Sequence, residues 1–292
     1  MKKIWSIIFS VLGIAFLIIT FLKYGPESEP KSTEETAQQK SLNKKEVAVE
    51  FWELYNEASD LRIARDYQKA AEYYRRALQK KPEHLDTIYY LGNMELTLGN
   101  FESAEKRWNS LIEINNASAR GHVQLGTVYS CRRLDNPLFD LPKATRHFEK
   151  ASSLNREITG PLLQLAKIDI LNRRFDDAEE RLLEVTKSNF RSFEGFFLRG
   201  YLAWKAGNTA EVQRHLGKSR SIAEGSEKFA NVGEGTTDSG EDPMLDNASR
   251  CALLTSEIQT ILNRYLIDNS YKPDKIYETF DNIISSNHKS HL

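Results

Sequence analysis

Residues 51–82 read FWELYNEASDLRIARDYQKAAEYYRRALQKKP, and the arrangement of small and large residues in this segment returns four more times along the chain. The copies begin about 34 residues apart, at Phe51, Leu85, Ala119, Thr159 and Phe193. A fixed period of this length predicts a protein built by stacking one structural unit on the next. Such stacks usually present an extended surface to other proteins and do not enclose one pocket for a substrate.

Each copy combines small and large residues at fixed positions. The eighth residues are Ala58, Gly92, Gly126, Ala166 and Gly200. The twentieth residues, small in four copies and counted in the third copy after an insertion of about six residues, are Ala70, Ala104, Ala144, Ala178 and Val212. The large residues four positions later are Tyr74, Trp108, Phe148, Leu182 and Leu216. Small residues let two helices cross closely, and a large side chain one turn further along fills the gap beside the crossing. Each copy therefore predicts two antiparallel helices.

Polar residues mark the expected start of the second helix in four copies. They are Asp66, Asn100, Asp140 and Asn208. A side-chain oxygen at this place is expected to accept a hydrogen bond from a free backbone N–H of the helix. Gly99 and Gly207 stand one residue earlier, where glycine ends a helix in the left-handed conformation.

This pattern resembles the tetratricopeptide repeat (TPR) family over about residues 51–226. The first two copies fit best, through Ala58, Tyr67, Ala70, Tyr74, Ala77, Pro82, Leu91, Gly92, Gly99, Ala104 and Trp108. The third copy carries about six extra residues near 132–139, and the fifth has Val212 and Ser219 where alanine is usual. The resemblance implies an all-α fold, a TPR-type α-solenoid of antiparallel helix pairs over residues 46–226. A plain helical bundle is the alternative, but bundles do not keep one register through five copies.

Residues 4–22, IWSIIFSVLGIAFLIITFL, form an uncharged apolar run behind the short tail 1–3. Its length matches a bilayer core, so it predicts an N-terminal transmembrane helix that anchors the chain. A cleaved signal peptide is an alternative, although the run exceeds a signal core and no small-x-small cleavage site follows it; a buried helix is another. Lys2 and Lys3 favour a single-pass protein with its N-terminus inside and its repeats outside, in the periplasm if the source is bacterial.

The remaining segments are expected to be accessory. Residues 23–45 are rich in Pro, Glu, Ser, Thr, Gln and Lys and predict a flexible linker. Residues 227–247 predict a loop, disordered or packed as a lid; GEGTTDSG at 233–240 lacks the ending of a phosphate-binding loop. Residues 248–292 predict C-terminal capping helices and a tail, with helices at about 248–266 and 273–284.

Composition and motifs limit the kinds of ligand and reaction that we expect of this chain. The chain of 292 residues has a net charge of −1, which gives no support for nucleic-acid binding. We find no metal-ligand spacing, catalytic motif or cofactor motif, and therefore expect no enzyme, no metal, no cofactor and no small-molecule substrate. Cys131 and Cys251 are expected to be free buried thiols, because a bridge requires the C-terminal helix to fold back onto the third repeat.

The TPR resemblance implies that the first helix of each repeat lines a concave groove that binds protein partners. The positions that point into it, with bulky neighbours, give nine candidates: Tyr55, Tyr89, Tyr90, Asn93, Arg120, Lys167, Phe197, Tyr201 and Trp204. Tyr and Trp are common anchors at interfaces; the alternative is that some of these side chains pack between helices. Asn93 and Arg120 are only a fragment of the set with which one TPR subclass holds chaperone tails, so we do not expect that partner.

We therefore expect a membrane-tethered TPR scaffold that binds protein partners during assembly of a cell-envelope complex, such as one for secretion, pili, polysaccharide or cytochrome maturation. Two alternatives stay open. One is an anchored adaptor that faces the cytosol, and the other is a membrane-bound enzyme with a site in residues 224–247.

The first prediction concerns residues 4–22. Because the run is long and lacks a cleavage site, the mature protein should retain it and sediment with membranes. Cell fractionation followed by N-terminal sequencing measures both properties. A soluble protein that begins near residue 25–30 would contradict the anchor.

Overall fold

The structure, a computed structural model, describes residue 23 and residues 33–230, 251, 253–267 and 272–289. Every regular element among these residues is an α-helix. The chain divides into two units, residues 1–50 and 51–292, which are described separately. The first unit contributes the opening part of α2 (Thr33–Ile63), and all the packing described below belongs to the second.

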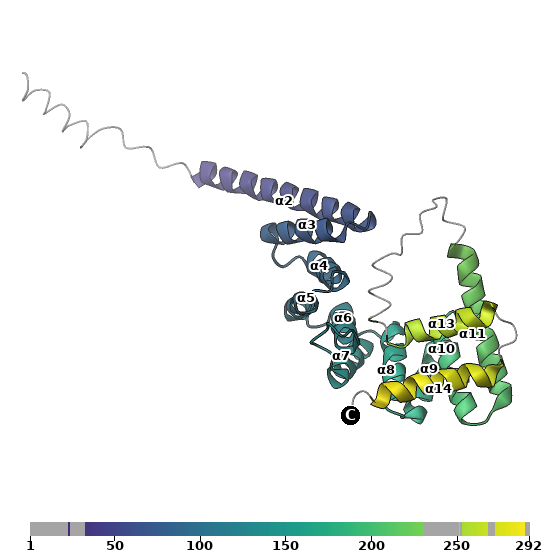
Figure 1. Ribbon diagram of the computed structural model, residues 1–292. Helices are drawn as coiled ribbons and strands as arrows, with labels where there is room; N and C mark the ends of the chain where they lie inside the picture. The colour runs from purple at the N-terminus through teal and green to yellow at the C-terminus, as the bar shows by residue number, and fades with distance from the viewer. Residues whose placement is uncertain (1–22, 24–32, 231–250, 252, 268–271, 290–292) are drawn as a thin grey trace, which may run out of the picture. The chain divides into compact units, whose positions relative to one another are not determined.

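The second unit contains the predicted helix pairs, seen in succession in Figure 1. The end of α2 pairs with α3 (Tyr67–Lys80), and α4 (Leu85–Thr97) pairs with α5 (Phe101–Ile114). The pairs that follow are α6 (Ala119–Ser130) with α7 (Leu141–Leu154), α8 (Gly160–Leu171) with α9 (Phe175–Ser188), and α10 (Phe193–Lys205) with α11 (Thr209–Ala230). The two helices of each pair pack together, and the second helix of a pair packs on the first helix of the next, so the all-α solenoid expected from the period is confirmed.

The small and large positions meet inside the second and third pairs, as expected. A Cβ atom added to Gly126 would lie 2.6 Å from the ring of Phe148, and one added to Gly92 would collide with the indole of Trp108. Phe148 and Trp108 are fully buried. The absence of a side chain on the first helix thus creates the space that the aromatic ring of the second helix fills.

Three of the four predicted helix caps are confirmed. Asp66 Oδ1 accepts a hydrogen bond from Lys69 N at 3.2 Å, Asp140 Oδ1 from Lys143 N at 2.8 Å, and Asn208 Oδ1 from Glu211 N at 3.3 Å. The prediction for Asn100 was wrong, since its side chain makes no capping bond. Gly99 and Gly207 adopt the left-handed conformation, with φ of +81° and +73°.

The side chain of Asn100 instead forms a hydrogen bond with a buried carboxylate. Its Nδ2 donates to Glu95 Oε2 at 2.8 Å, while Arg75 Nη2 from the preceding repeat lies 3.1 Å from Glu95 Oε1. Asp169, whose side chain is 1% exposed, is held in the same way by Arg174 and Arg181. A buried charge needs both a counter-ion and hydrogen bonds, and this need outweighs the small gain from a cap.

The N-terminal segment differs from the expected linker. Residues 33–45 are helical, because α2 begins at Thr33. They contain Glu, Gln, Lys and Ala, which are good helix formers, and neither Gly nor Pro. The predicted anchor at residues 4–22 lies outside the described residues. None of the helices formed by the described residues combines the length and the apolar character needed to cross a membrane.

The C-terminal segment returns to the repeats. α11 continues to Ala230, into the segment expected to be a loop from 227, and residues 231–247 lie outside the described part of the chain. The two expected helices are α13 (Thr255–Ile267) and α14 (Pro273–Lys289). Figure 1 shows both lying across the last two repeats, and α14 packs on α8, α10 and α11.

The expectation of two free thiols was wrong. Cys131 at the end of α6 and Cys251 before α13 form a disulfide that joins positions 120 residues apart. Both sulfur-bearing residues are buried. The bridge exists because the C-terminal segment does fold back onto the third repeat, a contact between distant parts of the chain that no local pattern announces.

The second prediction tests the crossing of α6 and α7. Gly126→Ala should destabilise the fold by about 1–3 kcal/mol, because the new Cβ overpacks against Phe148. Thermal unfolding measures the loss. The matched control is Gly160→Ala, since a Cβ at Gly160 meets no atom within 4 Å. Equal melting temperatures for the two variants would show that the crossing tolerates a side chain.

The third prediction concerns the bridge. Replacing Cys131 and Cys251 by serine should lower the free energy of unfolding by about 2–5 kcal/mol, because the closed loop restricts the unfolded chain. Chemical denaturation with and without a reductant measures this difference. The double serine variant should be insensitive to the reductant, whereas an unchanged wild-type transition on reduction would argue against the bridge.

Candidate functional site

The structure separates the nine predicted groove residues into two groups. Tyr55, Tyr89, Tyr90, Asn93 and Arg120 on α2, α4 and α6 are partly exposed, and we refer to these five as the amino-terminal groove. Lys167, Phe197, Tyr201 and Trp204 on α8 and α10 are the carboxy-terminal groove, and the first three of these are 0% exposed. The prediction that all nine face an open surface was therefore wrong for Lys167, Phe197 and Tyr201.

Aromatic rings run along the amino-terminal groove. Tyr90 stacks on the buried Tyr74 with ring centroids 6.0 Å apart, and Tyr89 meets the edge of Tyr90 at 5.4 Å. Tyr55 meets Tyr74 edge-on at 5.8 Å. Burial raises the pKa of Tyr55, so its phenol stays protonated and retains a hydrogen-bond donor. The rings hold one another in place, which lowers the entropy lost when a partner packs on them.

Two arginines cover these rings. The guanidinium carbon of Arg62 lies 4.6 Å from the ring centre of Tyr90, and that of Arg120 lies 4.8 Å from Tyr89. Arg120 also pairs with Asp86 at 2.5 Å, with both side chains close to half exposed. Arg62 was not among the predicted groove residues. Arg62 lies in the last turn of α2, and its place in the first helix of the repeat was the only sign in the sequence that it could belong to the groove.

Two polar side chains lie beside the rings. Gln124 Nε2 donates to Tyr89 Oη at 3.0 Å, which fixes the direction of that phenol. Asn93 Oδ1 is buried and accepts no hydrogen bond from the described residues. Leaving a buried amide oxygen without a donor costs folding free energy.

The carboxy-terminal groove is occupied by the chain itself. Phe197 and Tyr201 lie under α14, with ring centroids 5.1 Å from that of Phe280 in each case. Lys167 lies under the start of α13, where its Nζ donates to Thr255 Oγ1 at 2.8 Å and pairs with Glu194 at 3.1 Å. Burial lowers the pKa of Lys167, and the carboxylate of Glu194 opposes that effect.

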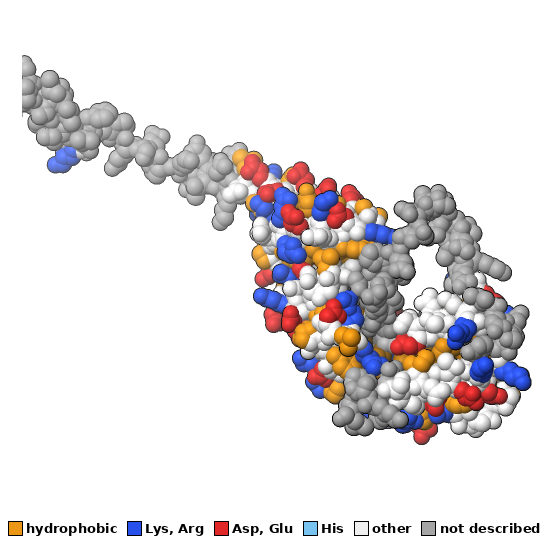
Figure 2. All heavy atoms as spheres, in the orientation of Figure 1, with side chains coloured by type: hydrophobic (Ala, Val, Ile, Leu, Met, Phe, Trp, Pro, Cys, Tyr) orange, Lys and Arg blue, Asp and Glu red, His pale blue; other side chains and the backbone are white. Residues whose placement is uncertain are grey.

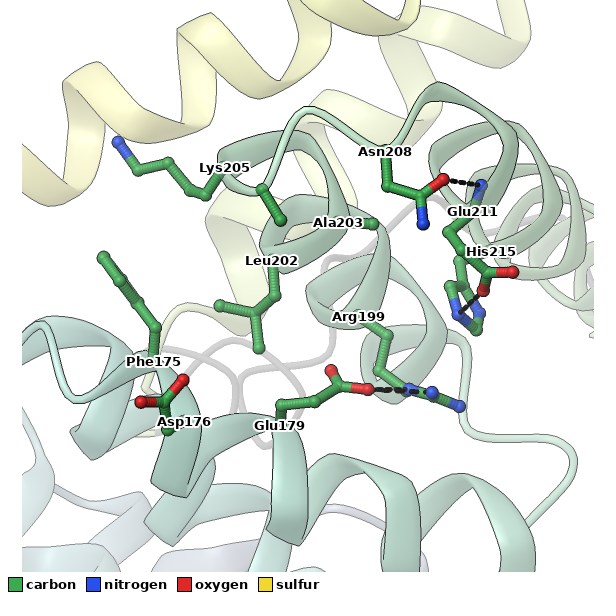
Figure 3. Close-up of a pocket in the computed structure, with 11 residues that line it drawn as sticks. Phe175, Asp176, Glu179, Arg199, Leu202, Ala203, Lys205, Asn208, Glu211 and His215 are labelled. Atoms are coloured by element: carbon green, nitrogen blue, oxygen red, sulfur yellow. Dashed lines mark hydrogen bonds and ion pairs between the residues drawn. The ribbon is translucent and has the colours of Figure 1, made fainter.

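An open cavity of about 410 Å³ lies elsewhere, between α9, α10 and α11. Its polar side chains face one another in Figure 3: Arg199 pairs with Glu179 at 2.8 Å, and His215 with Glu211 at 3.1 Å. Burial, with the nearby Arg199, lowers the pKa of His215 to about 4, so the imidazole is neutral at pH 7. The cavity is a crevice between neighbouring helices whose Arg199 and His215 are each bound to a carboxylate.

Two histidines of the third repeat are in contact with each other. Nδ1 of His122 on α6 and Nδ1 of His147 on α7 are 3.0 Å apart. Burial, followed by His122, lowers the pKa of His147 to about 4. One neutral imidazole donates its Nδ1–H to Nδ1 of the other, and this hydrogen bond joins the two helices of the pair. Within the described residues, no group of three His, Cys, Asp or Glu side chains is placed to hold a metal ion.

Charges of both signs are interspersed over the face shown in Figure 2. Such a mixture produces no extended positive field of the kind that attracts nucleic acid. The distinctive surface is therefore the amino-terminal groove, where aromatic rings and arginines lie together.

Comparisons with known proteins agree with this architecture. The tetratricopeptide repeat model matches residues 61–123. A MamA structure from Desulfovibrio magneticus RS-1 is 9% identical, with a TM-score of 0.50, and covers 61% of this chain and 97% of its own. A double mutant of MamA RS-1 has a TM-score of 0.51 at 9% identity, over 61% of this chain and 97% of that one.

YrrB, described as a TPR protein with an unusual peptide-binding site, is 18% identical, with a TM-score of 0.45 over 61% of this chain and 89% of its own. A comparison with curated proteins gave no match. The likeness to the MamA structures shows a shared fold. The family model adds a match in sequence at residues 61–123. Residues 61–123 thus match the tetratricopeptide repeat, and the second unit shares the fold of the MamA structures.

Proposed function

We propose that this chain is a membrane-tethered scaffold that binds protein partners through its amino-terminal groove, during assembly of a cell-envelope complex. The TPR fold supports the general role of a protein-interaction adaptor. The observation that carries the specific proposal is the row of Tyr55, Tyr90 and Tyr89 with Arg62 and Arg120 over its rings. Aromatic and arginine side chains in a partly exposed groove are the residues that dominate binding energy at interfaces.

The chemistry of the groove favours a peptide segment with apolar side chains, which would pack on the tyrosine faces. Acidic side chains would find Arg62 and Arg120, although Asp86 already neutralises part of the second charge. The adjacent Trp52, 47% exposed, extends the apolar surface.

The disulfide supports an exterior location for the repeats. Bridges persist in oxidising compartments and are rare in the cytosol of most organisms. Together with the apolar run at residues 4–22, the Cys131–Cys251 bridge favours repeats outside the membrane over the cytosol-facing alternative. Protease protection in intact and permeabilised cells separates these two orientations.

The enzyme alternative places a site in residues 224–247, of which 231–247 lie outside the described part. The TPR fold, which usually serves protein binding, supports the scaffold over this alternative. The fold alone does not decide between them, because folds host many functions.

The fourth prediction separates binding from folding. Tyr89→Ala should leave the melting temperature nearly unchanged and abolish recovery of crosslinked partners, because this ring is partly exposed in the groove. Tyr201→Ala should destabilise the fold by about 3–5 kcal/mol, because it empties a buried site. Crosslinking of intact membranes, followed by purification and mass spectrometry, measures recovery.

The matched control is Phe190→Ala, which removes an aromatic ring that is 68% exposed and lies outside the groove. This variant should fold and recover every partner. If Tyr89→Ala also folds normally and still recovers every partner, the amino-terminal groove is not the binding surface.

A further inference from the structure

The carboxy-terminal groove already contains a bound helix. α14 turns one apolar face towards α10, and the fully buried residues of that face are Ile276, Tyr277, Phe280 and Ile284. Ring centroids of Tyr277 and Phe197 lie 5.3 Å apart, and those of Tyr277 and Tyr201 lie 6.2 Å apart. The opposite face of α14 carries exposed Asp274, Lys275 and Glu278. An amphipathic helix lying in an aromatic groove is one of the recurring modes of peptide recognition.

The groove has a socket shaped for one ring of this helix. A Cβ on Gly200 would collide with the phenol oxygen of Tyr277, so only glycine at that position admits the ring. Tyr277 Oη then donates to the backbone oxygen of Phe197 at 3.3 Å. In the second and third repeats the corresponding glycine faces an aromatic residue of its own second helix. In the fifth repeat the α14 tyrosine takes that place.

Polar contacts recognise the helix beside its apolar face. Asp281 Oδ1 accepts a hydrogen bond from Tyr201 Oη at 2.7 Å and pairs with Lys205 Nζ at 2.8 Å. Arg173 Nη2 donates to Ser285 Oγ at 3.2 Å one turn later. Burial opposes ionisation of Asp281, but the bonds from Lys205 and Tyr201 keep the pKa of the carboxyl below its ordinary value. The groove therefore favours an acid next to the second aromatic residue.

α14 contacts α8, α10 and α11 of the repeats as well as its neighbour α13. An open cavity of about 340 Å³ lies between α13 and α14, lined by Ile261, Arg264, Thr279 and Ile283 among others. α13 is attached separately, through the Cys131–Cys251 bridge and through Lys167 at Thr255. α13 and α14 therefore have separate attachments to the repeats.

We propose that α14 is a displaceable internal ligand, and that the carboxy-terminal groove accepts in its place an amphipathic helix of a partner protein with the same chemistry. That chemistry is a tyrosine, an aromatic residue three positions later followed by an acid, and an aliphatic residue four positions after the aromatic, as in Tyr277, Phe280, Asp281 and Ile284. The inference extends the proposed function to the last two repeats. Uncovering Phe197 and Tyr201 is unfavourable, so the groove exchanges one helix for another and does not stand empty.

The test uses the full-length chain and a fluorescent peptide with the sequence of residues 273–289, titrated by anisotropy. In the wild-type chain the tethered helix competes at an effective concentration in the millimolar range, so the peptide should bind weakly. Phe280→Ala in the chain weakens the internal helix, and peptide affinity should then rise by about tenfold or more. A peptide carrying Phe280→Ala should not show this gain.

A charge exchange distinguishes recognition from nonspecific adhesion. In the Phe280→Ala chain, a peptide with Asp281→Lys should bind about tenfold more weakly than the natural peptide, because the lysine meets Lys205. Adding Lys205→Glu to that chain should reverse the preference between the two peptides. Should Phe280→Ala not fold, Asp281→Lys in the chain replaces it, because that change loosens α14 without creating a cavity.

Two outcomes would overturn the exchange of α14 for a partner helix. Folded variants that bind no peptide, or that bind the natural and substituted peptides equally, would show that α14 is a fixed cap and overturn the inference. A wild-type dimer in light scattering that dissociates on Phe280→Ala would make the occupant a second copy of the chain, which also overturns a separate partner. Neither result depends on Tyr89, so the amino-terminal groove can succeed or fail by itself.

Discussion

The fit between a residue without a side chain and a large ring opposite is the constraint on which the rest of this solenoid depends. At Gly126 and Gly92 the first helix of a repeat approaches the second so closely that Phe148 and Trp108 fill the remaining space completely. Where this fit recurs, the packing of a pair is set locally and carried on to the next pair of the stack. The first helices of the first three repeats then lie side by side, so that Arg62 reaches Tyr90 and Arg120 reaches Tyr89.

Charges inside the stack follow from the same geometry. Glu95 and Asp169 occupy the same position in the first helices of the second and fourth repeats, and both are almost fully buried. Arginines from neighbouring helices neutralise them, and in the second repeat Arg75 comes from the repeat before. A buried pair of this kind is weak evidence for stability, but one with fixed geometry penalises any slip between adjacent repeats.

The fifth repeat shows how the stack ends. Its glycine, Gly200, meets Tyr277 of α14, which lies 77 positions further along the sequence. In the second and third repeats the corresponding glycine meets an aromatic ring of the same repeat. A terminal repeat has no successor to cover it, so its aromatic residues need another apolar partner. The C-terminal segment supplies one and thereby divides the groove, leaving Tyr55, Tyr89 and Tyr90 partly exposed while Phe197 and Tyr201 are covered.

The sequence by itself determined the repeat period, the pairing of the helices, three caps and the two left-handed glycines, because each depends on contacts within some 34 residues. It also placed the two C-terminal helices through their periodicity. Only the tertiary structure decided which groove residues are exposed, that Asn100 serves Glu95, and that Cys131 meets Cys251. The bridge and the covering of Phe197 and Tyr201 depend on where a segment 80 to 120 residues away returns, and sequence spacing carries no information about such a return. The hydrogen bond of Asn100 depends on the burial of Glu95 beside Arg75 of the preceding repeat.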